Sequence, residues 1–329
     1  MAEVLLKVKN LSTLFRTEGG VVKAVDNISF EVRAGETFAL VGESGCGKSV
    51  TALSIMRLIP TPPGEITSGT VEFDGIDLLK LRNREMRAIR GSKIGMIFQE
   101  PMSSLNPVLT IQSQLAEPLK IHMKLSSGAA NDRAEELVNM VGIPDARARL
   151  QQYPHELSGG QRQRIMIAMA MSCAPRLLIA DEATTALDVT IQAQILDLMQ
   201  DVTEQSGTSL LIITHNLGIV ARYADRVAVM YAGKLREVSD ASDMYAEPQH
   251  PYTVGLLRSV PRLDSDKGAP LTPIAGEIPD LTDLPDGCAF NPRCPWAVER
   301  CFTDDPELEE ISTGKQVACF EHASVALHD

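Results

Sequence analysis

The sequence predicts an α/β fold in which helices pack against a largely parallel sheet. Strand-like and helix-like segments alternate over residues 4–259, as they do when helices connect parallel strands. One Gly-rich stretch joins a strand-like run to a helix-like run, and another strand-like run ends in two carboxylates. Four of the six cysteines gather near the C-terminus. These observations predict an α/β core followed by a small cysteine-containing extension.

The bulk composition restricts the class of protein. A chain of 329 residues can hold two domains, each with its own core. The net charge of -12 argues against nucleic acid as the main partner, because phosphate binding requires a basic face. The N-terminal stretch lacks a signal-peptide pattern, and no apolar run approaches the ~18 residues that span a bilayer. We therefore expect a cytosolic protein whose thiols stay reduced.

The first element with a chemical meaning is the Gly-rich stretch. Strand-like TFALV runs directly into GESGCGKS, and the helix-like VTALSIMRLI follows. This context is that of a P-loop, in which backbone N–H groups and a helix N-terminus surround phosphates. We expect Lys48 to reach the β- and γ-phosphates of ATP and the Ser49 hydroxyl to ligate Mg²⁺. The residues expected to form the nucleotide site are Gly42, Glu43, Ser44, Gly45, Cys46, Gly47, Lys48, Ser49 and Val50.

A second strand-like run, RLLIADEA, carries adjacent acids at its end. Asp181 suits an outer ligand of Mg²⁺, and Glu182, one residue on, suits a base that polarises water. Two acids after a strand often serve only to cap a helix. Beside a P-loop, the catalytic interpretation is favoured.

The later elements follow the same alternation. KIGMIF at 93–98 and SLLIIT at 209–214 read as buried strands, and IMIAMA as a buried helix. A stripe of Ile191, Ile195, Leu198 and Val202 predicts a helix packed on the sheet. RVAVMYAGKLREV at 226–238 predicts two strands joined by a turn at Ala232 and Gly233.

The most specific motif is HELSGGQRQRIMIAMAM at 155–171, in which a serine and two glycines open a helix. Backbone donors and a hydroxyl at a positive helix end favour an anion. Here the sequence resembles the ATP-binding subunits of ABC transporters, whose LSGGQ signature contacts the nucleotide of the opposite subunit. The resemblance places Ser158, Gly159, Gly160 and Gln161 at such an interface.

Other family motifs occur in the family's order, and the resemblance implies their roles. Gln99 matches the Q-loop residue that meets Mg²⁺, water and the membrane subunits. TTALD ends at Asp188 and matches the D-loop, and His215 matches the switch histidine near the γ-phosphate. Phe15 is the expected aromatic stacking partner of adenine, although it could equally face the core.

The resemblance extends to the tail and suggests the domain limits. HPYT and CxxNPRCP in the tail resemble the oligopeptide, dipeptide and nickel branch of ABC importers. We expect an ABC ATPase domain at 4–259, with a helical subdomain at about 100–157 that docks on membrane subunits, and an extension at 260–329.

That branch implies a function and partners. The expected role is an ATPase that powers import of di- or oligopeptides at the cytoplasmic face of the bacterial inner membrane. The expected partners are a second ATPase chain in a heterodimer, two transmembrane permease subunits and an extracytoplasmic solute-binding protein. Nickel or another small solute is the alternative cargo. A soluble ABC ATPase acting on nucleic acid or ribosomes, and a regulator without ATPase activity, are the remaining alternatives.

The tail cysteines are Cys288, Cys294, Cys301 and Cys319, with gaps of five, six and seventeen residues. A cytosolic location disfavours disulfides, and hydrophobic packing remains possible. Thiolates select Zn²⁺ or iron–sulfur clusters, but the gaps match neither the usual zinc spacing nor ferredoxin spacings. Resemblance to peptide-importer ATPases favours a [4Fe–4S] cluster, with Zn²⁺ as the alternative.

Overall fold

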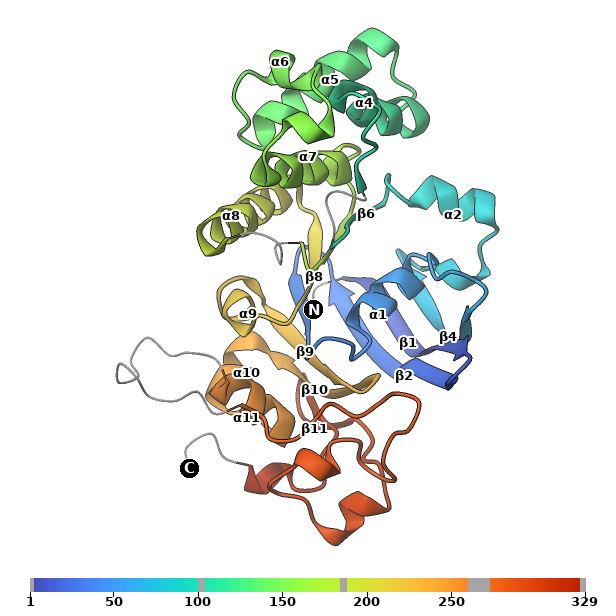
Figure 1. Cartoon of the computed structure of the whole chain (residues 1–329), viewed down its shortest axis with the longest axis vertical. Coiled ribbons are helices and arrows are strands. Elements are labelled where there is room, and N and C mark those ends of the chain that lie inside the picture. The colour runs from blue at the N-terminus through green and yellow to red at the C-terminus, as the bar shows by residue number, and fades with distance from the viewer. Residues whose placement is uncertain (1–2, 100–103, 184–187, 260–272, 326–329) are drawn as a thin grey trace. The chain divides into compact units, whose positions relative to one another are not determined.

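The computed structural model describes residues 3–99, 104–183, 188–259 and 273–325 (Figure 1). These residues form two compact units, each assembled from separate stretches of the chain. Unit 1 consists of Met1–Glu3, Arg33–Gly35 and Lys80–Ile212, and unit 2 of Val4–Val32, Glu36–Leu79 and Ile213–Asp329. In the described part of the chain, no helix combines the length and apolar character needed to cross a bilayer. The domain limits expected from the sequence stay a prediction.

Unit 2 begins with an antiparallel sheet of long strands, in the order β2-β1-β4-β5. β1 pairs with β4 from Leu6 opposite Phe73 to Phe15 opposite Gly64. Leu6 and Val8 are buried two residues apart, as are Leu11 and Thr13, and an irregularity in the pairing with β4 separates the two pairs. The strands are β1 (Val4–Thr17), β2 (Gly20–Arg33), β4 (Gly64–Phe73) and β5 (Ile76–Asp77).

A second set of strands in unit 2 carries the phosphate-loop motif and the tail. Its order is β3-β9-β10-β12-β11, with β3 parallel to β9 and the later pairs antiparallel. The tail therefore adds a hairpin directly to the edge of β10. The strands are β3 (Thr37–Val41), β9 (Arg226–Tyr231), β10 (Lys234–Asp240), β11 (Glu309–Ser312) and β12 (Lys315–Val317).

Short helices cover these strands and join the tail to the core. In Figure 1 the orange-red tail lies beside α11 and β10. One hydrophobic core includes residues from β3, β9 and α11 together with Cys288, Phe290 and Cys301 of the tail. The helices are α1 (Lys48–Ile55), α9 (Leu217–Tyr223), α10 (Ala241–Ala246) and α11 (Pro251–Arg258).

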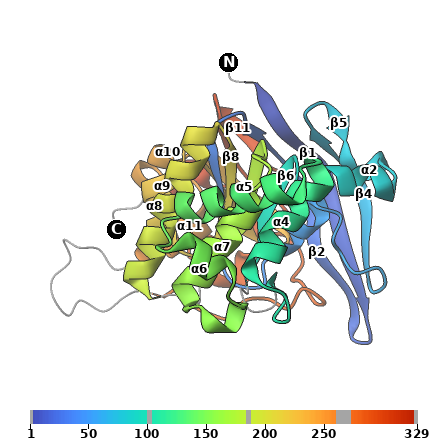
Figure 2. The same cartoon turned by 90° about the horizontal axis from the view of Figure 1, so that it is seen from above.

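Unit 1 contains a helical cluster and the strands β8-β7-β6, of which β6 and β7 are parallel. The contacts of α4, α5, α6 and α7 with one another form the cluster, which Figure 2 shows in green. The strands are β6 (Ile94–Ile97), β7 (Leu177–Asp181) and β8 (Ser209–Thr214), the last reaching into unit 2. The helices are α2 (Asn83–Ile89), α4 (Ile111–His122), α5 (Ser127–Met140), α6 (Ala146–Leu150), α7 (Gly159–Met171) and α8 (Val189–Ser206).

The expected strands and helices are confirmed, with two corrections. The helix expected over residues 50–59 is shorter, because α1 ends at Ile55. β9 and β10 form the predicted hairpin, and its turn residues Ala232 and Gly233 both have positive φ. The stripe predicted on α8 was centred wrongly: Ile195 and Val202 are buried, but Ile191 and Leu198 are only partly buried. The buried face also includes Leu196 and Met199. Successive helical residues are ~100° apart around the axis. The buried face is therefore rotated toward Leu196 and Met199, and Leu198 lies at its edge.

Candidate functional site

The Gly-rich loop of residues 42–47 connects β3 to α1 and is packed tightly against its neighbours. Gly42 and Gly47 have φ of 155° and 110°. A Cβ at Gly42 would lie 2.2 Å from the Met230 carbonyl oxygen, and one at Gly47 would lie 2.1 Å from that of Ala24. Only glycine tolerates both the conformation and this approach. The loop is therefore shaped by its backbone, whereas the side chain of Ser44 at its tip is exposed.

Lys48 begins α1 and turns back over the loop. Its ammonium group donates to the carbonyl oxygens of Gly42 and Glu43, each at 2.9 Å, and the residue is only 4 % exposed. Cys46 lies beneath it, and burial raises the pKa of that thiol, so it is neutral at pH 7. The Lys48 ammonium group therefore lies against the backbone of the Gly-rich loop.

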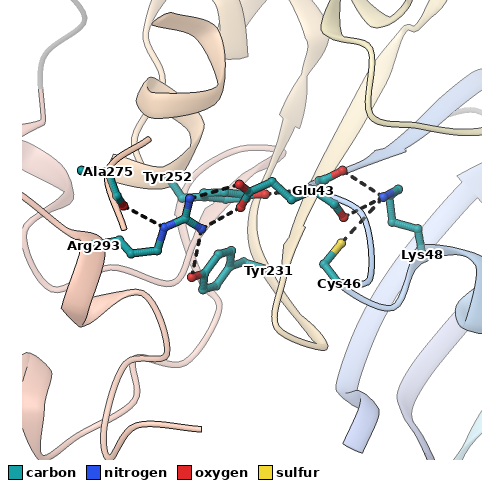
Figure 3. A network of polar contacts seen from close by, with 8 residues as sticks. Glu43, Cys46, Lys48, Tyr231, Tyr252, Ala275 and Arg293 are labelled. Atoms are coloured by element: carbon teal, nitrogen blue, oxygen red, sulfur yellow. Dashed lines mark hydrogen bonds and ion pairs between the residues drawn. The ribbon is translucent and has the colours of Figure 1, made fainter. Parts of the chain in front are cut away.

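Glu43, the second residue of the loop, is held by the C-terminal tail (Figure 3). Arg293 makes a two-pronged ion pair with it, Nη1 to Oε2 at 2.8 Å and Nη2 to Oε1 at 3.1 Å. The Arg293 side chain is 4 % exposed and that of Glu43 is 22 % exposed. Burial alone would lower the pKa of Arg293, but its hydrogen bonds to Glu43 and Tyr231 raise it, so it stays charged.

Two tyrosines complete the support of this loop. The Glu43 amide donates to the Tyr252 hydroxyl at 2.8 Å, and Arg293 Nη1 donates to the Tyr231 hydroxyl at 3.3 Å. Burial raises the pKa of both phenols, so both are neutral at pH 7. Their rings contact each other and Phe290, at centroid distances of 4.6 to 5.4 Å. Sequence reasoning noted HPYT and NPRCP only as branch motifs and missed these contacts with the loop.

In unit 1, the structure brings Gln99 and Glu182 together. The side-chain amide nitrogen of Gln99 (Nε2) donates a hydrogen bond to a carboxylate oxygen of Glu182 at 2.9 Å. Asp181, the last residue of β7, is 5 % exposed, whereas Glu182 is partly exposed and has a φ of 44°. The change of backbone conformation after Asp181 separates the two acids, so one is buried in the strand end and the other is accessible.

The signature residues form a reciprocal helix cap at the start of α7. The Ser158 hydroxyl accepts from the Gln161 amide at 3.3 Å, and the Ser158 amide donates to the Gln161 side chain at 3.0 Å. Gly159 is exposed and Gly160 partly so, and a Cβ at Gly160 would lie 3.3 Å from Ile191. The cap satisfies two donors and leaves the glycine backbone accessible at the helix end.

Three further predicted residues occupy distinct positions. Asp188 caps α8 by accepting from the Ile191 amide at 2.9 Å; the preceding D-loop residues 184–187 lie outside the described residues. His215 is exposed directly after β8. Phe15 is partly buried on β1, opposite Gly64. A Cβ added at Gly64 would lie 2.9 Å from the Phe15 ring.

The tail cysteines line one common cavity of about 20 Å³, together with His250, Phe290 and Trp296. A volume of this size holds about one water molecule. All four side chains are free thiols. Burial raises the pKa of Cys288, and it raises the pKa values of Cys294 and Cys319 to about 11 and about 12. Among the residues that the structure describes, no three His, Cys, Asp or Glu side chains converge in metal-binding geometry.

Two protein families match separate stretches of this chain. Residues 25–185 match the ABC transporter family, and residues 237–301 match the C-terminal region of oligopeptide/dipeptide transporters. The chain is 56% identical over 326 residues to the dipeptide transport ATP-binding protein DppD of Bacillus subtilis, covering 99% of this chain and 97% of that protein. It is 52% identical over 308 residues to the oligopeptide transport ATP-binding protein OppD of the same organism, covering 94% and 86%.

A solved structure supports the fold. The dimeric post-hydrolysis state of an ATP-binding cassette bound to ADP and phosphate has a TM-score of 0.65 and 28% identity, covering 72% of this chain and 99% of that one. The cassette accounts for the core, and the tail match covers the extension as far as Cys301. The chain therefore belongs to the ATP-binding subunits of ABC transporters, in the oligopeptide and dipeptide branch.

Proposed function

We propose that this chain hydrolyses MgATP to power the import of di- and oligopeptides. The observation that carries the proposal is the full-length similarity to peptide-transport ATPases, which includes the tail as well as the cassette. The loop around Lys48, the accessible Glu182 and the glycine-opened helix α7 are the matching structural features.

The roles of the individual residues form part of the proposal. Lys48 binds the β- and γ-phosphates, and Ser49 ligates Mg²⁺ with Asp181 as an outer ligand. Glu182 accepts the proton of the attacking water, and its hydrogen bond with Gln99 fixes the direction of the carboxylate. This bond gives Gln99 a positioning role beside its proposed contact with Mg²⁺. The remaining proposed contacts are Phe15 with adenine, His215 with the γ-phosphate and Asp188 across the dimer interface.

The proposed assembly is a heterodimer of two ATPase chains beneath two permease subunits, at the cytoplasmic face of the inner membrane, with an extracytoplasmic solute-binding protein. Two observations support pairing. The exposed Gly159 and the partly exposed Gly160, at the N-terminus of α7 beside Ser158, suit a phosphate that another chain presents. The similar solved cassette is a dimer, according to its description.

For the cysteines, we propose a metal site, with a [4Fe–4S] cluster as the first choice and Zn²⁺ as the alternative. Four thiols around one cavity provide a complete donor set for either. Arg236 is fully buried, and its Nε and Nη2 have no hydrogen-bond partner among the described residues. Its charge, which is also paired with Asp305, lowers the pKa of Cys288 but does not outweigh burial, which raises it. Because the cavity is small, the cysteines must move outward to hold a cubane, whereas a single ion requires less movement.

Uptake by cells tests the function. In a strain that lacks this subunit, the wild-type chain should restore uptake of a labelled dipeptide, and Glu182→Gln should not. Restored uptake of nickel without peptide uptake would replace the cargo but keep the ATPase assignment. For the metal, protein purified without oxygen should absorb broadly near ~400 nm and contain about four irons per chain. One zinc per chain without iron would select the alternative metal. Absence of any metal would mean that the cysteines serve only in hydrophobic packing.

A further inference from the structure

We infer that Arg293, in the C-terminal tail, is a positioning residue for the phosphate-binding loop, so that the tail controls ATP affinity. The inference rests on the proposed binding of ATP at this loop. Arg293 and Glu43 are 250 residues apart in the sequence, and their ion pair joins the tail to the loop within unit 2. The contacts are those in Figure 3.

Arg293 is itself rigidly held. Its Nε donates to the Ala275 carbonyl oxygen at 3.0 Å, and Nη1 also donates to the Tyr231 hydroxyl. The guanidinium lies over the rings of Tyr231 and Phe290, at 5.8 and 5.9 Å from their centroids. A planar guanidinium held by these contacts can fix the position of the carboxylate with which it forms two hydrogen bonds.

Glu43 connects Arg293 to Lys48. The Glu43 carboxylate binds Arg293, its amide donates to Tyr252, and its carbonyl oxygen accepts from Lys48 Nζ. All three polar groups of this one residue are thus engaged. Moving its side chain would move the peptide group that Lys48 contacts, and with it the loop.

Arg293 also acts on the loop through its charge. Glu43 places a carboxylate within a loop that is shaped for phosphates, and an unpaired negative charge there would repel a nucleotide. Arg293 neutralises it through a largely buried pair, where solvent screens little. Loss of Arg293 would therefore loosen the loop and expose an opposing charge at the same time.

Nucleotide binding to the full-length chain tests the inference. Titration calorimetry with MgADP should show about a tenfold or greater loss of affinity for Arg293→Met. Arg293→Lys keeps the charge without the fork and should lie between Arg293→Met and the wild type. Arg300→Met is the matched control, because Arg300 is an exposed tail arginine whose ion pair is with Asp304, and it should bind as the wild type does. A wild type that binds no nucleotide would instead overturn the proposed function.

A double-variant cycle separates positioning from a general loss of folding. If the two side chains act as a pair, Glu43→Gln with Arg293→Met should lose less affinity than the two single losses multiplied, because the opposing charge is gone. Fully multiplicative losses, or unchanged affinity in Arg293→Met beside a wild type that binds, would overturn the inference.

The fluorescence of the single tryptophan gives a second readout, in a variant that keeps Arg293. Trp296 lies three residues after Arg293 and lines the cysteine cavity. Binding of MgADP to the wild type should change its fluorescence, since coupling between two sites is reciprocal. Glu43→Gln keeps Arg293 and its packing, so it should stay folded and lose this response. A response of equal size in Glu43→Gln would contradict the coupling.

Discussion

Replacing Tyr252 with phenylalanine removes one hydroxyl group that supports the loop. The Glu43 amide donates to this hydroxyl at 2.8 Å, and the tyrosine is fully buried. Phenylalanine keeps the ring contacts with Tyr231 and Phe290, so the substitution leaves the aromatic packing in place. The amide is left without its acceptor.

The loss of free energy comes from the one backbone N–H, that of Glu43, which no longer has a hydrogen-bond acceptor. An unsatisfied buried group costs about 1–3 kcal/mol, and water can partly reach this half-buried bond, which favours the lower half of that range. If the nucleotide-binding form of the loop needs the bond, ADP affinity falls by the same free energy, ~5- to 30-fold for about 1–2 kcal/mol. The free energy of unfolding falls by a similar amount.

Two assays on the full-length chain check the prediction. Urea unfolding gives the loss of stability, and titration calorimetry with MgADP gives the loss of affinity. Tyr245→Phe is the matched control, because it removes a hydroxyl that donates to the Leu217 carbonyl oxygen, elsewhere in unit 2. It should reduce stability by about 0.5–1.5 kcal/mol and leave ADP affinity unchanged. If Tyr252→Phe is less stable but binds ADP as tightly as the wild type, the Glu43–Tyr252 hydrogen bond does not support nucleotide binding.

Three other substitutions test separate parts of the molecule. Glu182→Gln in the assembled transporter should bind MgATP but turn over ~10²- to 10⁴-fold more slowly, measured as phosphate release, and near-normal turnover would reject this residue as the base. Ser158→Arg removes the cap of α7, so it should cost about 0.5–2 kcal/mol in urea unfolding, spare nucleotide binding at this chain and reduce hydrolysis at the partner's loop. Undiminished hydrolysis by the pair would argue against a shared site. Phe290→Ala should cost about 3–5 kcal/mol of stability, because the ring is 1 % exposed and packs on two tyrosines, whereas a cost below 1 kcal/mol would show that the aromatic cluster is loosely packed.

The parts of the site that lie within one short stretch could be predicted from the sequence. The strand, loop and helix around Lys48 are contiguous, and local glycine conformation determines their shape. The hairpin turn at Ala232 and Gly233 is local for the same reason. The ion pair of Glu43 with Arg293 was not predictable, because spacing says nothing about which residues meet across 250 positions.

Side chains with two possible uses were the other difficulty. Asp188 was assigned to a dimer interface by resemblance, and the structure shows its carboxylate capping α8, which is a use that any N-cap aspartate could have. The stripe on α8 was displaced because apolar spacing alone did not identify the side that faces the sheet. The cysteines were expected together, and one cavity does unite them, but spacing does not determine the metal.

The hairpin of β11 and β12 has a consequence for the order in which this protein is made. β12 (Lys315–Val317) pairs with β10, and Arg293 reaches the loop only from the tail. A ribosome synthesises Glu43 250 residues before Arg293, at ~5–20 residues per second. Until the tail is made, the nascent cassette therefore lacks the ion pair to Glu43, and the edge of β10 that β12 later covers stays unpaired. A chain that is interrupted before residue 293 would carry the complete loop motif and still lack the support that holds it.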